Sequence, residues 1–358
     1  MSNPTRRGIL TAGLSTLSLA TLGACGSSTT GGPAASASAA ASGSADAKPT
    51  GTITVYNAQH ESLTKEWIDG FSKQTGVQVT MRQGSDTELA NQIATEGAAS
   101  PADVFLTENS PAMTIVENKG LFAPVGATTV SQVPAAYRPS TNAWTGIAAR
   151  STVFVYNKTK LNASTLPASI MDLAKPEWAN RWAASPSGAD FQAIVSAILA
   201  LKGKDATAAW LQAMKTGSKA YKGNGAVMKA VNAGEIEGGV IYHYYFFGDQ
   251  AKGGQNSGNV DLHYFGKQDP GAFVSVSGGG VLKSSKNPVA AQAFLAYVTG
   301  QAGQQVLRDG TAFEYPVASG VSANAKLKPL AELQAPTVDI AKLNGPEVVT
   351  LMQQAGLL

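Results

Sequence analysis

Tyrosine and histidine side chains gather at one point of this chain, where Tyr242, His243, Tyr244 and Tyr245 are consecutive. A phenolate is a hard anionic oxygen donor, so paired tyrosines can bind a hard trivalent cation. A free tyrosine, whose pKa is about 10, does not ionise alone at neutral pH, but a bound metal can displace its proton. The same pattern also fits a strand whose aromatic rings pack in a core. These four residues alone leave both interpretations open.

The segment in front of the tyrosines decides whether two phenols can meet. Gly238 to Ile241 is typical of a strand, because small residues are followed by β-branched ones. A strand that continued through Tyr244 and Tyr245 would send their rings to opposite faces. A strand that ended near His243, and turned into a loop or a helix start, would let both phenols converge on one point.

Strands alternate with helices in the first half of the chain. Residues 52–57, 77–81 and 102–106 are predicted strands, and each is followed by a helical pattern. This spacing predicts a mostly parallel sheet. His60 and Glu108 stand just after the first and the third strand, where open α/β sheets bind ligands. Each of the two, taken singly, is equally well explained as a polar residue near a helix start.

A long strand and a candidate anion site follow. Residues 144–157 are predicted to form a strand long enough to cross between two domains, and residues 168–182 a helix and a turn. Small residues from Ser185 to Asp190 precede a predicted helix, whose free backbone N–H groups suit an anion. The motif is weak by itself because any helix cap looks similar.

Composition excludes several classes of protein. A chain of 358 residues is long enough for two domains. A net charge of +3 with 14% charged residues provides no strong basic field, so we expect no nucleic-acid partner. The single cysteine, Cys25, rules out an intramolecular disulfide and a thiolate metal cluster. Neither a Gly-x-Ser-x-Gly elbow nor a His-Glu-x-x-His motif is present to support a hydrolase.

The first 25 residues are typical of an export signal, in which Arg6 and Arg7 precede an apolar run that ends at Leu22. Leu22 to Cys25 resembles a bacterial lipobox, in which the cysteine becomes the lipidated first residue of the mature protein, and the arginine pair resembles a twin-arginine motif. The apolar run is short for a membrane span. Residues 26–50, rich in Ser, Ala, Gly and Thr, are predicted to be a disordered tether. We therefore expect a lipid-anchored protein on the outer face of the cytoplasmic membrane.

Several segments together resemble the ferric-iron-binding proteins of bacterial ABC importers. They are Val55–Glu61, Pro101–Glu108, Ser187–Ala189, Tyr244–Tyr245 and Glu314–Pro316. The resemblance implies an α/β fold of the two-lobed type II periplasmic-binding-protein kind, with a mostly parallel sheet flanked by helices in each lobe and a ligand cleft between the lobes. We expect the N-terminal lobe at residues 51–135 and 275–325, and the C-terminal lobe at residues 136–274 and 326–358.

The resemblance also implies a set of binding residues. The iron ligands carry over to His60, Glu108, Tyr244 and Tyr245. The residues that hold a synergistic anion, such as phosphate or carbonate, carry over to Ser187, Gly188, Ala189 and Asn224. Relatives often have Asn before the tyrosine pair, where this chain has Tyr242 and His243. These two residues and Arg150 are further candidates for the site.

Charge arithmetic agrees with Fe³⁺ as the ligand. Two phenolates and one carboxylate supply three negative charges, which balance the cation, and neutral His60 supplies none. Four protein ligands leave positions open around a metal that favours six, so an anion or water has to complete the shell. Oxygen-rich ligation without thiolates suits a hard cation better than zinc or copper.

The predicted function is therefore capture and delivery rather than catalysis. A two-lobed protein that closes on its ligand by hinge motion would capture Fe³⁺ outside the membrane and pass it to an ABC permease and its ATPase. We expect it to act as a monomer. The nearest alternative is a binding protein of the same fold for a phosphonate, a polyamine or thiamine, with the tyrosines only stacking on the solute.

Overall fold

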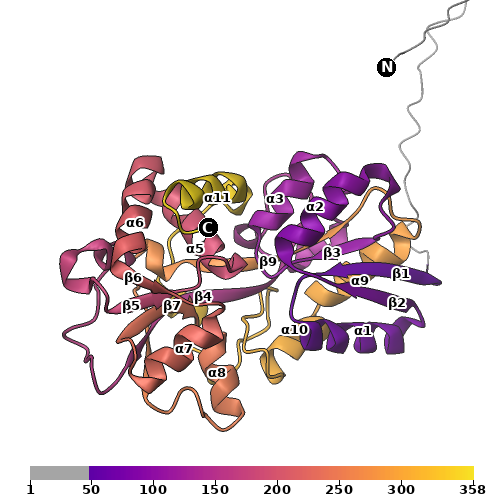
Figure 1. The fold of residues 1–358 in the computed structure, drawn as a ribbon. Coiled ribbons are helices and arrows are strands. Elements are labelled where there is room, and N and C mark those ends of the chain that lie inside the picture. Colours follow the sequence, from indigo (N-terminus) through magenta and orange to yellow (C-terminus); the bar gives the residue numbers. More distant parts are fainter. Residues whose placement is uncertain (1–47) are drawn as a thin grey trace, which may run out of the picture. The chain divides into compact units, whose positions relative to one another are not determined.

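A computed structural model gives the fold of residues 48–358 (Figure 1). The predicted export signal with Cys25, and the predicted tether up to residue 47, lie outside these described residues. Within residues 48–358, none of the helices combines the length and the apolar character needed to cross a membrane.

A mixed sheet of nine strands organises the described chain, in the order β2-β1-β3-β9-β4-β7-β5-β6, with β8 paired to β4. The strands are β1 (Thr52–Asn57), β2 (Gln78–Gln83), β3 (Val104–Leu106), β4 (Thr145–Asn157), β5 (Trp182–Ala184), β6 (Ser218–Ala220), β7 (Gly238–Tyr242), β8 (Val260–His263) and β9 (Val274–Val281). We call β1, β2 and β3 the N-terminal group, and β5, β6 and β7 the C-terminal group.

The long strand β4 joins the two groups of strands. Its residues 145–151 pair antiparallel with β9, and its residues 152–157 pair antiparallel with β7 and β8. Within each group the pairs are parallel: β1 with β2 and β3, and β5 with β6 and β7. Parallel ladders joined by a long crossing strand agree with the expected type II periplasmic-binding-protein fold.

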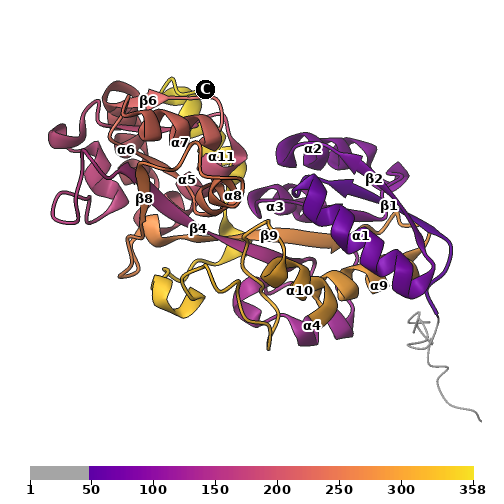
Figure 2. The ribbon, with the colours of Figure 1, turned by 90° about the horizontal axis from the view of Figure 1, so that it is seen from below.

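Helices flank both groups of strands (Figures 1 and 2). They are α1 (Glu61–Thr75), α2 (Asp86–Glu96), α3 (Pro111–Asn118), α4 (Ala127–Gln132), α5 (Ala189–Lys202), α6 (Lys204–Gly217), α7 (Asn224–Ala233), α8 (Tyr244–Ala251), α9 (Pro288–Thr299), α10 (Gln301–Asp309) and α11 (Gly345–Gln354). In the N-terminal group, α2 and α3 cover one face of the strands, and α1, α9 and α10 cover the other. In the C-terminal group, α5, α6 and α11 pack together, and α7 packs on β7.

Local sequence explains how the helices beside the site begin and end. α1 buries Leu63, Trp67 and Phe71, which recur every four residues along one face. It ends at Gly76, whose φ of 79° lies in the left-handed region that glycine adopts readily. α2 begins with a capping box formed by Ser85 and Glu88.

Residues 168–182 do not form the predicted helix. They form two short 3₁₀ helices, Ile170–Ala174 and Pro176–Trp178. Pro176 lacks a backbone N–H and disfavours a helical conformation at the residue before it, so Lys175 is extended, with φ −77° and ψ 152°. The predicted helix is therefore replaced by two short 3₁₀ helices that are separated at Lys175.

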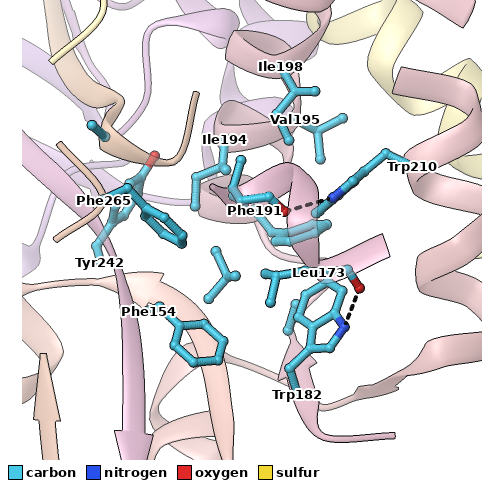
Figure 3. Close-up of a cluster of buried hydrophobic side chains, with 14 of the residues drawn as sticks. Phe154, Leu173, Trp182, Phe191, Ile194, Val195, Ile198, Trp210, Tyr242 and Phe265 are labelled. Atoms are coloured by element: carbon cyan, nitrogen blue, oxygen red, sulfur yellow. Dashed lines mark hydrogen bonds between the residues drawn. The ribbon is translucent and has the colours of Figure 1, made fainter. Parts of the chain in front are cut away.

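A buried aromatic cluster holds β5, α5 and α6 together (Figure 3). The indole N–H groups of Trp182 and Trp210 donate to the backbone oxygens of Leu173 and Ile170, at 3.1 and 3.0 Å. Phe191 on α5 stacks on Trp210, with ring centroids 6.1 Å apart. This packing fixes the first turn of α5, which contributes to the candidate site.

Candidate functional site

His60 and Glu108 lie at one edge of the sheet because their strands are parallel. β1 ends at Asn57 and β3 ends at Leu106, and these two residues are partners in the parallel ladder. His60 occupies the N-cap position of α1, and Glu108 follows β3. Their side chains meet, with Nε2 of His60 2.6 Å from Oε1 of Glu108. The structure therefore brings these two predicted site residues together.

The paired tyrosines begin a helix. β7 ends at Tyr242, His243 has helical backbone angles of φ −58° and ψ −35°, and Tyr244 and Tyr245 are the first residues of α8. Their rings stack with centroids 4.4 Å apart. Both hydroxyls donate to the same oxygen, Oδ2 of Asp190, at 3.0 and 3.2 Å. The strand thus ends before the tyrosine pair, which allows the two phenols to converge on one point.

Contact between His60 and Tyr244 joins the two pairs into one cluster. Their ring centroids are 4.9 Å apart in an edge-on arrangement. A cavity of about 970 Å³ opens beside them, lined also by Tyr245, Lys65 and Lys252. His60 and the paired tyrosines line this cavity, so a solute from outside can reach these three residues.

Asp190 is the functional candidate that the sequence reasoning missed. Its carboxylate is buried in the first turn of α5. Besides the two phenols, it accepts from the side-chain amides of Asn109 at 2.9 Å and Asn224 at 2.8 Å. The only signal in the sequence was its position directly after the Ser187–Ala189 loop.

The cluster holds protons that a bound cation would displace. Burial, reinforced by the charge of Asp190, raises the pKa of both Tyr244 and Tyr245 well above the usual value. Burial by itself would lower the pKa of His60, but the carboxylates of Glu108 and Glu314 raise it to about 10. Burial also raises the pKa of Asp190, and the charge of Glu108 adds to this shift. Binding of a cation is therefore coupled to proton release.

A buried ion pair contacts His60. Arg150 and Glu314 are both fully buried, with Nη2 of the arginine 2.5 Å from Oε2 of the glutamate. The other glutamate oxygen, Oε1, lies 3.0 Å from Nδ1 of His60. Burial by itself would raise the pKa of Glu314, but Arg150 and His60 lower it to about 2. Arg150, a candidate site residue, is thus engaged in this ion pair.

Tyr242 and His243 do not join the paired tyrosines. The Tyr242 hydroxyl donates to Oδ1 of Asn109 at 3.3 Å. His243 is fully buried, accepts at Nδ1 from the backbone N–H of Ser151 at 3.1 Å, and stacks on Tyr315 with centroids 4.8 Å apart. Burial lowers the pKa of His243 to about 3, so its ring is neutral. Both residues are therefore buried neighbours of the cluster and not members of it.

The Ser187–Ala189 loop leads into the first turn of α5. Gly188 occupies the N-cap position, and its N–H donates to the backbone oxygen of Ser185 at 3.0 Å. Asn224, at the start of α7, directs its amide to Asp190. The amide that the resemblance assigns to an external anion therefore holds a carboxylate of the chain itself.

The donors gathered here are one imidazole, two phenols and the carboxylates of Glu108 and Asp190. Among residues 48–358, no three His, Cys, Asp or Glu side chains are arranged to hold a metal ion by themselves. A metal bound at this cluster consequently needs the phenol oxygens. Such an oxygen-rich set suits a hard, highly charged cation.

The chain is similar to known bacterial solute-binding proteins. Residues 99–344 match the family model of bacterial extracellular solute-binding proteins. The chain is 64% identical over 306 residues to the Fe(3+)-binding periplasmic protein of Serratia marcescens, and the alignment covers 86% of this chain and 90% of that protein.

Two solved structures share the fold over nearly their whole length. Iron-bound HitA from Pseudomonas aeruginosa has a TM-score of 0.80 at 39% identity, covering 86% of this chain and 99% of its own. A Trichodesmium protein (IdiA, FutA), solved in complex with iron and citrate ligands, has a TM-score of 0.76 at 26% identity, covering 86% of this chain and 100% of its own.

Proposed function

This chain belongs to the bacterial extracellular solute-binding proteins, a family of binding proteins rather than enzymes, and we propose that it captures Fe³⁺ for an iron importer. The relative from Serratia marcescens is named for Fe(3+) binding, and the similar Pseudomonas aeruginosa structure is iron-bound. The proposed ligands are His60, Glu108, Asp190, Tyr244 and Tyr245.

The shared carboxylate oxygen carries the proposal. Two phenol oxygens lie 3.0 and 3.2 Å from Oδ2 of Asp190, each joined to it by a proton. A cation that replaces those protons finds three oxygen donors already close together. The ring of Tyr244 lies against His60, which in turn reaches Glu108. His60 is therefore next to the three oxygen donors, and Glu108 is next to His60.

Charge favours Fe³⁺ over a divalent cation at this set. Two phenolates, Glu108 and Asp190 supply four negative charges, one more than Fe³⁺ carries and two more than a divalent ion carries. Neutral His60 adds a nitrogen donor without charge. Five protein donors leave one position of a six-coordinate ion open.

A synergistic anion contributes less to iron binding in this protein, as proposed here, than the resemblance implies. An external phosphate or carbonate would compete with Asp190 for the Asn224 amide, and it would add negative charge to a set that already exceeds the cation. We propose that Asp190 takes the place of the anion at Asn224. Water, or a small anion held by backbone N–H groups of the Ser187–Ala189 loop, completes the shell.

The test is a titration of the purified protein with ferric citrate, followed by visible absorption. Tyrosinate bound to Fe³⁺ absorbs visible light, whereas binding of an organic solute leaves the protein colourless. We expect a coloured complex in the wild type. Tyr245→Phe removes one phenolate and should lower the affinity at least about tenfold, since changes to residues that only support a metal ligand already cost that much.

Tyr264→Phe is the matched control. Its hydroxyl is buried and has no hydrogen-bond partner among the described residues, so its loss removes no ligand. We expect the same colour and affinity as in the wild type. A Tyr245→Phe protein with unchanged affinity would remove Tyr245 from the site, and a colourless wild type would reject iron as the solute.

Delivery completes the proposed function. A solute-binding protein of this family passes its ligand to a membrane transporter, and we propose an ABC permease with its ATPase as the partner. We also propose that lipidation of Cys25 holds the protein at the outer face of the cytoplasmic membrane, on the basis of the lipobox in the sequence.

A further inference from the structure

The two oxygens of the buried Glu314 carboxylate have different neighbours. Oε2 accepts from Nη2 of Arg150 at 2.5 Å, from Nε2 of Gln59 at 3.3 Å and from the Ser277 hydroxyl at 3.4 Å. Oε1 lies 3.0 Å from Nδ1 of His60. Three donors thus hold one oxygen in place, and the other oxygen faces the imidazole.

The backbone on both sides of Glu314 is held in place. Phe313 has a φ of 53°, in the left-handed region that a bulky residue adopts only when its surroundings enforce it. Tyr315 forms a two-way backbone bridge with Ala149, at 2.8 and 2.9 Å. These constraints keep Glu314 at a fully buried position, where an isolated charge would be costly.

We infer that Glu314 is a positioning residue for His60, an inference that rests on the proposed binding of Fe³⁺. In a neutral imidazole only one nitrogen carries the proton, and a carboxylate beside Nδ1 keeps the proton there. Nε2, which lies 2.6 Å from Glu108, then presents its lone pair to the cation. The same carboxylate makes the imidazole a more basic ligand.

Arg150 makes this arrangement compatible with a cluster that is already negative. Its guanidinium lies 2.5 Å from Oε2 of Glu314, so the buried carboxylate is neutralised locally. Glu314 can therefore act on His60 without adding a further uncompensated charge next to the two phenolates. The Arg150–Glu314 pair orients His60 and leaves the charge balance of the ligands unchanged.

The test is a double-mutant cycle on Fe³⁺ affinity, measured by competition with citrate. Glu314→Gln is made in the wild type and in His60→Ala. If Glu314 acts through His60, Glu314→Gln lowers the affinity about 10- to 100-fold in the wild type, the usual effect of removing a group that supports a metal ligand. In His60→Ala it changes the affinity by less than about twofold, because the residue that it positions is absent.

The visible band provides a second readout that a merely structural role would not move. A less basic imidazole leaves the iron a stronger acceptor of tyrosinate electrons. The absorption band of the Glu314→Gln complex should therefore shift to longer wavelength. The same substitution in His60→Ala should leave the band where it is.

Two further variants separate positioning from folding. Glu314→Gln leaves Arg150 without a counter-charge, so Glu314→Asp serves as the second variant, because it keeps the charge and shortens the reach to His60. It should show the same dependence on His60. Glu237→Gln is the matched control, since it breaks an ion pair with Arg181, of 2.7 Å, at the end of β7 opposite the tyrosines. It should leave affinity and colour unchanged.

Each outcome decides the inference. Equal losses of affinity with His60 present and absent, or a band that stays unshifted in both Glu314 variants, would overturn the positioning role while leaving iron as the solute. A wild type without a coloured complex would reject the proposed function itself, and the positioning role with it.

Discussion

At the residue scale, Asp190 places an anionic group of the chain where an external anion is expected. Its carboxylate accepts from Asn224 and from both phenols, and these are the groups that an anion bridging metal and protein would use. A covalently attached carboxylate loses less freedom on binding than an anion from solution. Iron affinity should accordingly depend little on the anion supplied.

Replacing Asp190 should create a dependence on phosphate. Asp190→Ala removes one ligand and frees Asn224, so the affinity for Fe³⁺ without phosphate falls, by at least about tenfold. Phosphate then enters the vacated space and restores part of the affinity. Iron competition titrations with and without phosphate measure both effects, and the wild type should show little enhancement.

Asp190→Asn is the control for space. Its amide fills the same volume without the charge, so it should weaken iron binding and leave no room for phosphate. Phosphate enhancement of equal size in the wild type, Asp190→Ala and Asp190→Asn would show that Asp190 does not occupy the place of the anion.

The proton on His60 predicts how iron binding depends on pH. Because the pKa of His60 is raised to about 10, the iron-free residue is protonated at neutral pH and has to lose its proton to bind. Affinity should therefore fall as the pH falls below neutral. In a weakly buffered titration at pH 7.5, saturating Fe³⁺ should release about one proton more from the wild type than from His60→Gln. Equal release would mean that His60 is not a ligand.

At the element scale, the junction of β7 and α8 makes the site possible. The strand stops at Tyr242, and a helical residue at His243 starts the helix whose first two residues are the paired tyrosines. Residues that are neighbours in a helix differ by about 100° in direction, whereas neighbours in a strand point to opposite faces. The two phenols can therefore meet on one carboxylate.

Packing of α7 on β7 adds the Asn224 amide, and Gly239 permits that packing. A Cβ at Gly239 would lie 2.3 Å from Cγ1 of Val227 on α7 and 3.1 Å from the backbone oxygen of Ala183. Gly239→Ala should destabilise the iron-free protein by about 1–3 kcal/mol, the usual cost of overpacking a core, as measured by urea unfolding.

Gly248 on α8 provides the matched substitution. A Cβ there would meet nothing within 4 Å, and Ala favours a helix over Gly. Gly248→Ala should therefore leave stability unchanged or raise it by up to about 1 kcal/mol. If Gly239→Ala and Gly248→Ala changed the stability by the same amount, the close approach of α7 to β7 would not be what constrains Gly239.

At the scale of the described chain, the hydrogen bonds of Asn109 join the two groups of strands. Asn109, which follows β3, donates to Asp190 on α5 at 2.9 Å. It accepts from Tyr242 on β7 at 3.3 Å and from Ser275 on β9 at 2.9 Å. The proposed ligands also follow strands of both groups, so a bound cation would favour the arrangement in which these contacts form, as in hinge closure around a ligand.

Attachment to the membrane is the prediction that concerns the protein in the cell. Cys25→Ser removes the thioether-forming sulfur of the predicted lipobox, so the protein should move from the membrane fraction to the soluble fraction. Iron binding by the purified protein should not change, because residue 25 precedes the described fold. A Cys25→Ser protein that stays lipid-anchored would disprove this interpretation of the signal.

The sequence by itself determined the features that depend on local pattern. Strand ends could be located from β-branched runs and helix caps, and parallel strands bring their carboxyl ends to one edge of the sheet. Those two facts placed His60 and Glu108 at the carboxyl edge of the sheet, and the structure makes β1 and β3 neighbours there, so that the two side chains meet. The sequence pattern left open whether β7 ends near His243 or continues through the paired tyrosines. In the structure β7 ends at Tyr242.

The tertiary structure alone decided which further groups reach these residues. Glu314 lies far from His60 along the chain and meets it only in the folded structure. Asp190 meets the tyrosines from the first turn of α5, which packs through Phe191 on Trp210. His243, a neighbour of the paired tyrosines in sequence, instead faces Ser151 and the core. Such contacts depend on how separate elements pack, and periodicity within one element carries no information about its neighbours in space.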